Sequence, residues 1–356
     1  MRVVPASRFA PPSLAEIARR VDGRIERLLS DEIHRWTEAD PQLGQPLTAL
    51  RDLILAGGKR LRPAFCHWAF VGAGGDPGDP RVTDGGAALE LLHTFALIHD
   101  DIMDGSSTRR GTPTVHVTFE ERHDLEGWRG EGRRFGEGVA ILVGDLAFVY
   151  ADQLLAAAPP SAHAVFTELR IEVNVGQYLD LAGTARGRVG EEEARRISRY
   201  KSGKYTVERP LHLGAALAGR LDDLGAPLSG YGLPLGEAFQ LRDDLLGVFG
   251  DEILTGKPVG EDVREGKPTV LFALASQRAG TAAARVLERY GAPDLGEHDV
   301  ATLQDVLVET GAVEQVEHTI DELVARALVA LDTACLLPEA RHALEDLAQY
   351  VAGRDR

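Results

Sequence analysis

The chain has 356 residues, 44% of them hydrophobic, which is enough to bury a large core. Its 39 Lys and Arg are outnumbered by 55 Asp and Glu, giving a formal net charge of −16. This balance argues against a nucleic-acid-binding surface, which needs excess positive charge. No window approaches the roughly 20 apolar residues of a membrane span, and prolines interrupt the N-terminus where a signal peptide needs an apolar stretch. We therefore expect a cytoplasmic protein with no membrane span and no nucleic-acid partner.

Apolar residues recur at spacings of three and four from Ser13 onward, which is the pattern of amphipathic helices, whereas alternating strand patterns are scarce. The first such run consists of Leu14, Ile17, Val21, Ile25, Leu28 and Leu29. We interpret the Gly- and Pro-rich breaks at 73–81, 127–138, 156–161 and 219–230 as loops, because the helical pattern resumes after each. The sequence thus predicts an all-α fold, with one multi-helix domain at 13–356 and a poorly ordered tail at 1–12.

The two cysteines, Cys66 and Cys335, lie in apolar stretches and form no C-x-x-C motif. Neither a zinc site nor a disulfide framework is indicated. We expect both to be small buried hydrophobic residues.

An acidic cluster ends the apolar run that precedes Asp100, Asp101 and Asp104. Asp100 and Asp104 are four residues apart and therefore lie on one face of a helix. Two like charges at this spacing repel each other and need a cation in compensation. Carboxylates suit magnesium, which keeps several waters and is commonly completed by substrate phosphates. The cluster therefore predicts Mg²⁺ and a phosphorylated substrate, and the alternative is a solvated helix end.

A second acidic cluster, Asp243 and Asp244, also follows an apolar helical run, and the two clusters could face each other across a cleft. Gly247 occupies the position where a third aspartate would repeat the spacing of the first cluster. Asp251 lies beyond Gly250, where the helix could end, and is a weaker ligand candidate than Asp243. Whether Asp251 compensates for Gly247 stays open at this point.

Basic side chains accompany the acidic clusters. They are Lys59, Arg60 and Arg62 in GGKRLRP (57–63), and Arg109 and Arg110 just after the first acidic cluster. Guanidinium groups suit phosphate oxygens, although isolated basic triplets are usually solvated faces. His93 lies seven residues before Asp100, close to the same helix face, where it is either a phosphate donor or a satisfied core histidine.

Together, GGKRLRP, HDDIMD with TRRG, YKSGKYT, FQLRDD and GKPVGEDVREGK resemble the motifs of the trans-isoprenyl diphosphate synthases, the polyprenyl synthetase family, in family order from Gly57 to Lys267. The resemblance implies a helical bundle around a deep central cleft, where both acidic motifs hold Mg²⁺ on an allylic diphosphate. The implied metal ligands are Asp100, Asp101, Asp104, Asp243 and Asp244. Two departures are DDLLG in place of the commoner DDxxD, and Ser202 where threonine commonly follows the lysine.

The resemblance also implies two diphosphate sites. The site for isopentenyl diphosphate would comprise Lys59, Arg62, His93 and Arg110. The site for the allylic diphosphate would comprise Arg109, Lys201, Gln240, Lys257 and Lys267. The allylic substrate, dimethylallyl, geranyl or farnesyl diphosphate, would ionise and then be attacked by the isopentenyl double bond, with Asp100, Asp104, Asp243 and Lys201 central to catalysis.

The residues before the first acidic cluster bear on product length. Phe95 beside the small Ala96 resembles geranylgeranyl (C20) synthases, whereas many farnesyl (C15) synthases carry two adjacent aromatics there. We expect a C20 product, with C15 as the alternative. Two further alternatives are a class I terpene cyclase and an inactive regulatory subunit. The resemblance also implies a homodimer.

Overall fold

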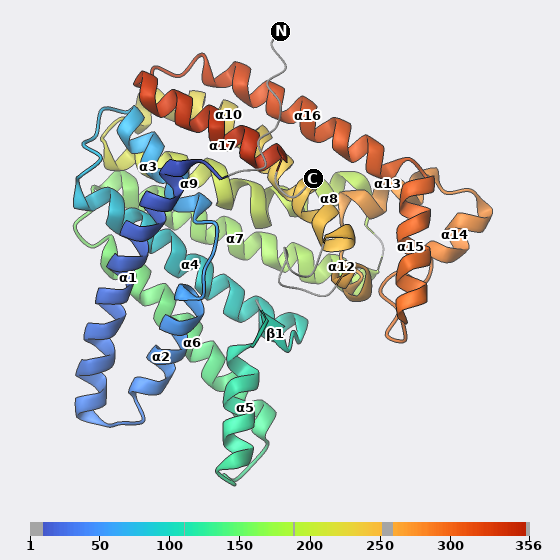
Figure 1. Cartoon of the computed structure of the whole chain (residues 1–356), viewed down its shortest axis with the longest axis horizontal. Helices are drawn as coiled ribbons and strands as arrows, with labels where there is room; N and C mark the ends of the chain where they lie inside the picture. Colours follow the sequence, from blue (N-terminus) through green and yellow to red (C-terminus); the bar gives the residue numbers. More distant parts are fainter. Residues whose placement is uncertain (1–9, 110, 188, 251–258, 354–356) are drawn as a thin grey trace. The chain divides into compact units, whose positions relative to one another are not determined.

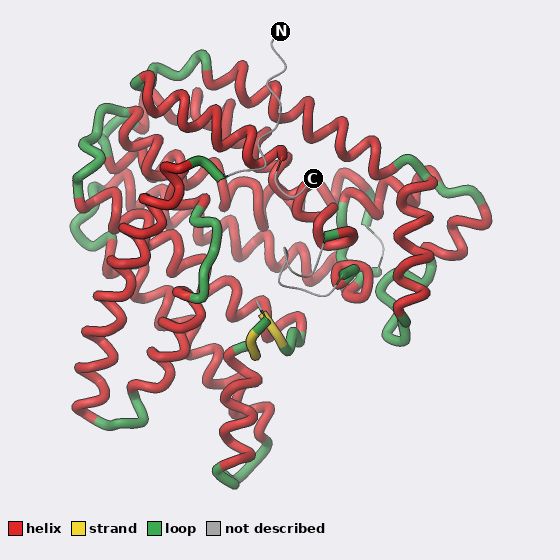
Figure 2. Tube along the Cα trace, in the orientation of Figure 1, coloured by secondary structure: helices red, strands yellow, loops and turns green. Residues whose placement is uncertain are grey.

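Helices form nearly all the regular structure of the described residues, which are 10–109, 111–187, 189–250 and 259–353 of a computed structural model (Figures 1 and 2). The predicted all-α class is confirmed. Two strands of two residues each, β1 (Thr108–Arg109) and β2 (Thr112–Pro113), pair antiparallel in a small hairpin. Within the described part of the chain, no helix is both long and apolar enough to cross a membrane.

The chain divides into two units, and the first, called here the N-terminal unit, contains Pro12–His67 and Asp76–Pro159. Its helices are α1 (Pro12–Ala39), α2 (Gly44–Leu55), the start of α3 (Leu61–Gly72), α4 (Pro80–Asp104), α5 (Val115–Leu125) and α6 (Gly132–Leu154). Helix α4 packs against α1, α2 and α6, and α5 packs against α6. The six apolar residues predicted for the buried face of α1 are all buried, so the helical periodicity is confirmed.

The C-terminal unit contains Trp68–Gly75 and the chain from Pro160 onward. Its helices are α7 (Pro160–Arg186), α8 (Glu191–Ser198), the π-helix η1 (Arg199–Glu208), α9 (Arg209–Leu217), α10 (Leu221–Phe249), α12 (Glu261–Glu265), α13 (Val270–Arg278), α14 (Thr281–Leu287), α15 (Glu297–Glu309), α16 (Ala312–Leu331) and α17 (Pro338–Gly353). Helix α10 is the centre of this unit, because α9, α16, α17 and η1 all pack against it. The assignment of 13–356 to a single domain stays a prediction, as does the central cleft.

Two of the predicted loops are wrong in part. Helix α10 begins at Leu221 and runs through most of the break predicted at 219–230, because Leu224 and Leu228 are buried at helical spacing. Helix α6 begins at Gly132, inside the break predicted at 127–138, and its Gly136 lies against the backbone of α5. Helix packing therefore outweighs the low helix propensity of Gly and Pro at these positions. The predicted disordered tail falls largely on residues 1–9, outside the described residues.

The predicted burial of both cysteines is confirmed for Cys66 only. Cys66 is buried, and burial raises the pKa of its thiol to about 12, as a small core residue requires. Cys335 is exposed, so its predicted burial is wrong. It lies in the segment that connects α16 to α17, where the apolar local sequence does not lead to burial.

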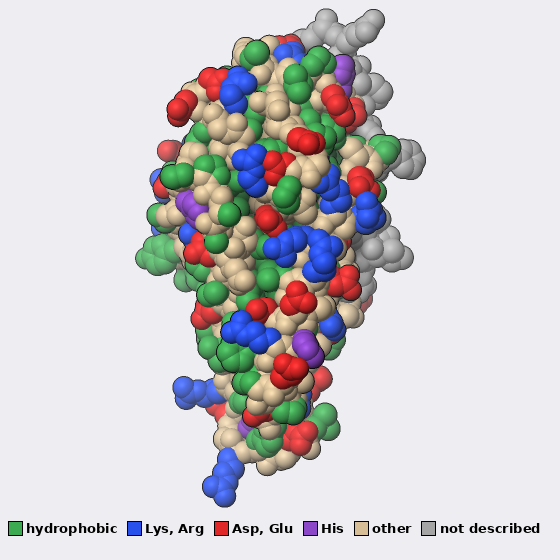
Figure 3. All heavy atoms as spheres, turned by 90° about the vertical axis from the view of Figure 1, so that its left-hand side faces the viewer, with side chains coloured by type: hydrophobic (Ala, Val, Ile, Leu, Met, Phe, Trp, Pro, Cys, Tyr) green, Lys and Arg blue, Asp and Glu red, His purple; other side chains and the backbone are tan. Residues whose placement is uncertain are grey.

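Charge is mixed on the molecular surface that Figure 3 shows, where basic side chains lie among acidic ones. Such interspersed charge gives no uniformly positive area for a phosphate backbone on the face in view. This agrees with the excess of acidic residues in the sequence.

Helix α10 packs closely against η1 in the C-terminal unit. A Cβ atom added to Gly236 of α10 would lie 2.4 Å from the carbonyl oxygen of Gly203 in η1, a backbone atom that cannot rotate away. This glycine pair therefore lets the lysine-bearing π-helix lie directly against α10.

We expect Gly236→Ala to lower the free energy of unfolding by about 1–3 kcal/mol, because the added methyl group overpacks this contact. Gly225→Ala, on the same helix, is the matched control, since its Cβ would meet Leu221 at an ordinary 3.6 Å. Urea unfolding of both variants measures the difference. Equal stability of the two variants would contradict the close contact.

Candidate active site

The first acidic cluster occupies the last turn of α4. The helix ends at Gly105, whose positive φ of 67° stops the helix and whose N–H donates to the carbonyl of Asp101. Asp100 is half-buried and Asp104 is exposed. Carboxylates at a helix C-terminus meet the negative end of the helix dipole, so their charge is unfavourable without a cation. This all-oxygen donor set fits a hard divalent cation such as Mg²⁺.

The third member of this cluster, Asp101, forms an ion pair. Its carboxylate is 2% exposed and accepts from Nε of Arg109 at 2.8 and 3.0 Å, while Nη2 of Arg109 lies 2.5 Å from Oδ1. Arg109 belongs to β1, just beyond the end of α4 (Figure 1). Asp101 therefore fixes a guanidinium group beside the acidic cluster. The predicted metal role of Asp101 and phosphate role of Arg109 stay predictions.

Arg60, in the basic motif 57–63, is a structural residue. It is 4% exposed, its guanidinium lies 2.8 Å from Asp22 Oδ1 and 2.7 Å from Glu90 Oε2, and it donates to the carbonyl of Ile54 at 2.6 Å. Two carboxylates thus neutralise it inside the N-terminal unit. The other two basic residues of this motif have access to solvent, because Lys59 is exposed and Arg62 is half-buried.

Phe95 lies between one and two turns before Asp100 on α4 and packs against two other rings. Its ring makes edge contacts with His99, at 4.6 Å between centroids, and with Phe148 of α6, at 4.9 Å. Ala96 and His93 are half-buried on the same helix. Phe148 is a residue that sequence reasoning missed, because the register of α6 against α4 is set by packing and leaves no signal in the local pattern.

The second acidic cluster lies near the C-terminal end of α10. Asp243 is half-buried, and Asp244 is 4% exposed and accepts from Gln240 Nε2 at 2.7 Å. Burial raises the pKa of Asp244 to about 7, with the hydrogen bond from Gln240 opposing this and the charge of Asp262 adding to it. A nearby cation would relieve this cost. Gln240, predicted to contact a diphosphate, contacts the acidic cluster.

Two predicted phosphate-binding lysines pair with carboxylates in the same unit. Lys201 of η1 lies 2.5 Å from Asp180 of α7, and Lys267 lies 3.2 Å from Asp262 and 2.7 Å from Glu265 of α12. Sequence reasoning missed these acidic partners. Asp262 and Glu265 lie within the quoted motif GKPVGEDVREGK, so that motif held the only signal for them, whereas Asp180 lies on a separate helix.

Three candidates, Arg110, Asp251 and Lys257, lie outside the described residues. The two acidic clusters belong to different units, and their predicted apposition across a cleft stays a prediction. Among the described residues, no three His, Cys, Asp or Glu side chains form a group able to hold a metal ion by themselves. Magnesium is commonly bound through one or two carboxylates, waters and substrate phosphates, so this finding agrees with the donor sets above.

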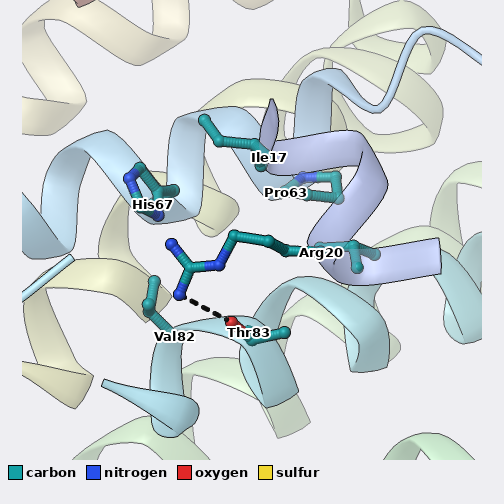
Figure 4. A pocket seen from close by; sticks show the side chains of 7 residues that line it. Ile17, Arg20, Pro63, His67, Val82 and Thr83 are labelled. Atoms are coloured by element: carbon teal, nitrogen blue, oxygen red, sulfur yellow. Dashed lines mark hydrogen bonds between the residues drawn. The ribbon is translucent and has the colours of Figure 1, made fainter. Parts of the chain in front are cut away.

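A small pocket in the N-terminal unit lies apart from the predicted site residues. Arg20 extends between His67 and Thr83 there and donates to Thr83 Oγ1 at 3.4 Å (Figure 4). Burial lowers the pKa of His67 to about 4, and the charge of Arg20 adds to this effect. None of the predicted substrate or metal residues lines this pocket, so it is not the candidate active site.

The sequence pattern of the polyprenyl synthetase family matches residues 45–307, a range that includes both acidic clusters and the lysine motifs. The chain belongs to the polyprenyl synthetase family. It is 35% identical over 335 residues to the short chain isoprenyl diphosphate synthase of Methanothermobacter thermautotrophicus, covering 92% of this chain and 96% of that protein. It is 32% identical over 312 residues to the geranylfarnesyl diphosphate synthase of Aeropyrum pernix, covering 85% and 92%.

A solved structure of this family is also similar throughout. Geranylgeranyl pyrophosphate synthase from Corynebacterium glutamicum, crystallised with isoprenyl diphosphate and magnesium, is 38% identical with a TM-score of 0.91, covering 96% of this chain and 99% of that one. As a polyprenyl synthetase family member, the protein is a prenyltransferase. The similar proteins differ in the product that their names give, so product length is a separate question.

We expect Arg60→Met to lower the free energy of unfolding by about 3–5 kcal/mol, because it leaves the buried carboxylate of Glu90 without its partner. Lys59→Met is the matched control, since Lys59 is exposed and its loss should leave stability nearly unchanged. Thermal and urea unfolding of the two variants give the comparison. A stable Arg60→Met variant would contradict a structural role.

Proposed function

We propose that this polyprenyl synthetase family member condenses isopentenyl diphosphate with allylic diphosphates to form geranylgeranyl diphosphate. The observation that carries the proposal is the carboxylate cluster in the last turn of α4, beside which Asp101 holds Arg109. A cluster of this charge is stabilised by cations, and a guanidinium next to it suits a phosphate that shares the cation. The match of the family pattern over residues 45–307 supports the same conclusion.

We propose that Asp100, Asp101, Asp104, Asp243 and Asp244 hold magnesium. When bound, Mg²⁺ stabilises the negative charge that develops on the departing diphosphate. The unfavourable position of Asp100 and Asp104 at a helix C-terminus and the burial of Asp244 support this role. The magnesium in the related Corynebacterium structure is consistent with it.

The basic residues would divide between two diphosphate sites. For isopentenyl diphosphate we propose Lys59, Arg62, His93 and Arg110, and for the allylic diphosphate we propose Arg109, Lys201, Gln240, Lys257 and Lys267. The paired carboxylates Asp180, Asp262 and Glu265 support this division, because they fix Lys201 and Lys267 within the C-terminal unit. Lysines that are already ordered lose less entropy when they bind phosphate.

The chemistry then needs positioning and charge stabilisation. The allylic carbon–oxygen bond breaks, its electron pair leaves with the diphosphate, and the double bond of isopentenyl diphosphate attacks the allylic cation. A proton is then lost to the released diphosphate, so no side-chain base is required. Lys201 and Arg109 would stabilise the leaving charge, and the apolar interior would exclude water from the cation.

We propose Phe95 and Phe148 as the floor that limits the growing chain. Their edge contact spans α4 and α6, and a prenyl chain that grows along α4 toward Phe95 would meet both rings. The single aromatic at Phe95 beside Ala96 favours C20 over C15. A terpene cyclase is disfavoured by the second acidic cluster and the basic motif, and an inactive subunit is disfavoured by the intact first cluster.

A homodimer is part of the proposal, and exposed apolar residues on α7 support it. Ile171, Val175, Tyr178 and Leu181 are 53%, 45%, 70% and 37% exposed and follow one another at spacings of three and four. An exposed apolar stripe of this kind marks an interaction surface, and a second copy of the chain is the occupant we propose. Light scattering should return twice the 38.4 kDa chain mass, and a monomer mass would contradict the dimer. We also propose a cytoplasmic location, which cell fractionation tests.

The function is tested by product analysis. Purified protein with Mg²⁺, isopentenyl diphosphate and either dimethylallyl, geranyl or farnesyl diphosphate should yield a C20 diphosphate from all three. Asp100→Ala should lower turnover by about 100-fold or more, because an electrostatic contact to the reacting diphosphate is lost. Asp31→Ala, an exposed change on α1, is the control that should retain activity.

Other outcomes distinguish the alternatives. A C15 product would show that the chain is stopped earlier than we propose. A cyclic hydrocarbon formed without isopentenyl diphosphate would identify a cyclase. Absence of product would favour an inactive subunit. Near-normal turnover of Asp100→Ala would remove Asp100 from the metal site.

We expect Phe148→Ala and Phe95→Ala each to shift products beyond C20, because each removes one ring from the proposed floor. Phe135→Ala, which removes another aromatic of α6, should leave the product distribution unchanged. Chromatography of the dephosphorylated products measures chain length. If Phe148→Ala gives the wild-type distribution, Phe148 is not part of the floor.

A further inference from the structure

The carboxylate of Asp262 fills the space beside Gly247. Gly247 lies four residues after Asp243 on α10, so both positions face the same side of the helix. A Cβ atom at position 247 would lie 1.8 Å from Asp262 Oδ2 and 2.4 Å from its Cγ. The side chain of Asp262 therefore stands where a side chain at position 247 would begin.

Helix α12, which carries Asp262, is anchored by its own packing. Val263 is fully buried, and its carbonyl accepts from the N–H of Gly291 at 3.0 Å. At the end of the helix, a Cβ atom on Gly266 would lie 2.9 Å from Cα of Gly291, so the two backbones are in direct contact. These contacts fix the position of α12, which also packs against α10, without involving the charge of Asp262.

The two oxygens of Asp262 have different neighbours. Oδ1 lies 3.2 Å from Nζ of Lys267, which also pairs with Glu265 at 2.7 Å. Oδ2 is the oxygen directed at Gly247. Asp262 thus joins a lysine proposed for the allylic diphosphate to the acidic end of α10.

We propose that Asp262 supplies the third carboxylate of the second acidic cluster, in place of the one that Gly247 lacks. The inference rests on the proposed function, because it assigns Asp262 to the same magnesium-dependent diphosphate site. Among the described residues no three His, Cys, Asp or Glu side chains form a group that could hold a metal ion by themselves. Asp262 would therefore bind the ion together with waters and the substrate diphosphate. The missing aspartate of the DDLLG motif is then replaced from a neighbouring helix.

The test measures metal binding without turnover. The melting temperature of the full chain is followed during Mg²⁺ titration in the presence of inorganic diphosphate. Asp262→Asn, which keeps the shape of the side chain, should raise the Mg²⁺ concentration for half-maximal stabilisation by about tenfold. Glu265→Gln is the comparison variant, because Glu265 also pairs with Lys267 from the same helix, whereas the three atoms nearest to a Cβ at position 247 all belong to Asp262. It should raise the Mg²⁺ requirement much less than Asp262→Asn does, because it disturbs only the position of Lys267.

An exchange of the two positions gives the decisive comparison. Gly247→Asp alone should lower the metal-free melting temperature, because its side chain collides with Asp262. Gly247→Asp combined with Asp262→Gly should recover both the fold and most of the Mg²⁺ affinity lost in Asp262→Asn. The metal-free melting temperature of every variant reports whether it folds.

Three outcomes would overturn the inference. One is a wild-type Mg²⁺ requirement in Asp262→Asn. Another is an equal loss in Asp262→Asn and Glu265→Gln without recovery in the exchanged variant, which would show that Asp262 only orders Lys267. The third is a wild-type protein that shows neither Mg²⁺-dependent stabilisation nor product, which would contradict the proposed function as well. If the wild-type protein responds normally, either of the first two outcomes contradicts this inference alone.

Discussion

The concentration of carboxylates at helix ends is the constraint on which the candidate site depends. Asp100 and Asp104 lie at the negative end of the α4 dipole, and Asp244 is buried at the end of α10. Each position raises the free energy of a carboxylate, so each requires positive charge nearby. Within the chain, Arg109 supplies part of this charge at the first cluster. The remaining demand is the physical basis of our proposal that the site takes a divalent cation and a diphosphate together.

Two ion pairs in this protein differ in how deeply the cation is buried. In the pair of Arg60 with Glu90 both side chains are buried, and the pair joins α4 to the segment before α3. The pair of Lys201 with Asp180 is more accessible, with the lysine side chain 23% exposed, so its ammonium group can still meet a ligand. Burial of the cation, more than the presence of a partner, therefore distinguishes the structural Arg60 from Lys201, which we propose as a ligand-binding residue.

Close helix packing determines where the chemical groups of the C-terminal unit lie. The contact of Gly236 with Gly203 seats the π-helix that carries Lys201, and the contact of Gly247 with Asp262 seats α12 against α10. In both cases the absence of a side chain lets a neighbouring element approach. The second acidic motif has Gly247 in place of an aspartate, and the carboxylate of Asp262 from α12 fills the space beside that glycine. A side chain at position 247 would collide with Asp262, so the two features have the same steric cause.

The sequence by itself determined the helical class, the buried face of α1, both acidic clusters and the family, because helical periodicity and motif spacing are local properties of the chain. It did not distinguish Arg60 from Lys59, and it did not identify Phe148, Asp180 or Asp262 as neighbours of the predicted residues. The contacts of Gly247 with Asp262, Lys201 with Asp180 and Phe95 with Phe148 join residues 15, 21 and 53 positions apart. Only tertiary packing decides them, because the register of one helix against another depends on the shapes of both surfaces.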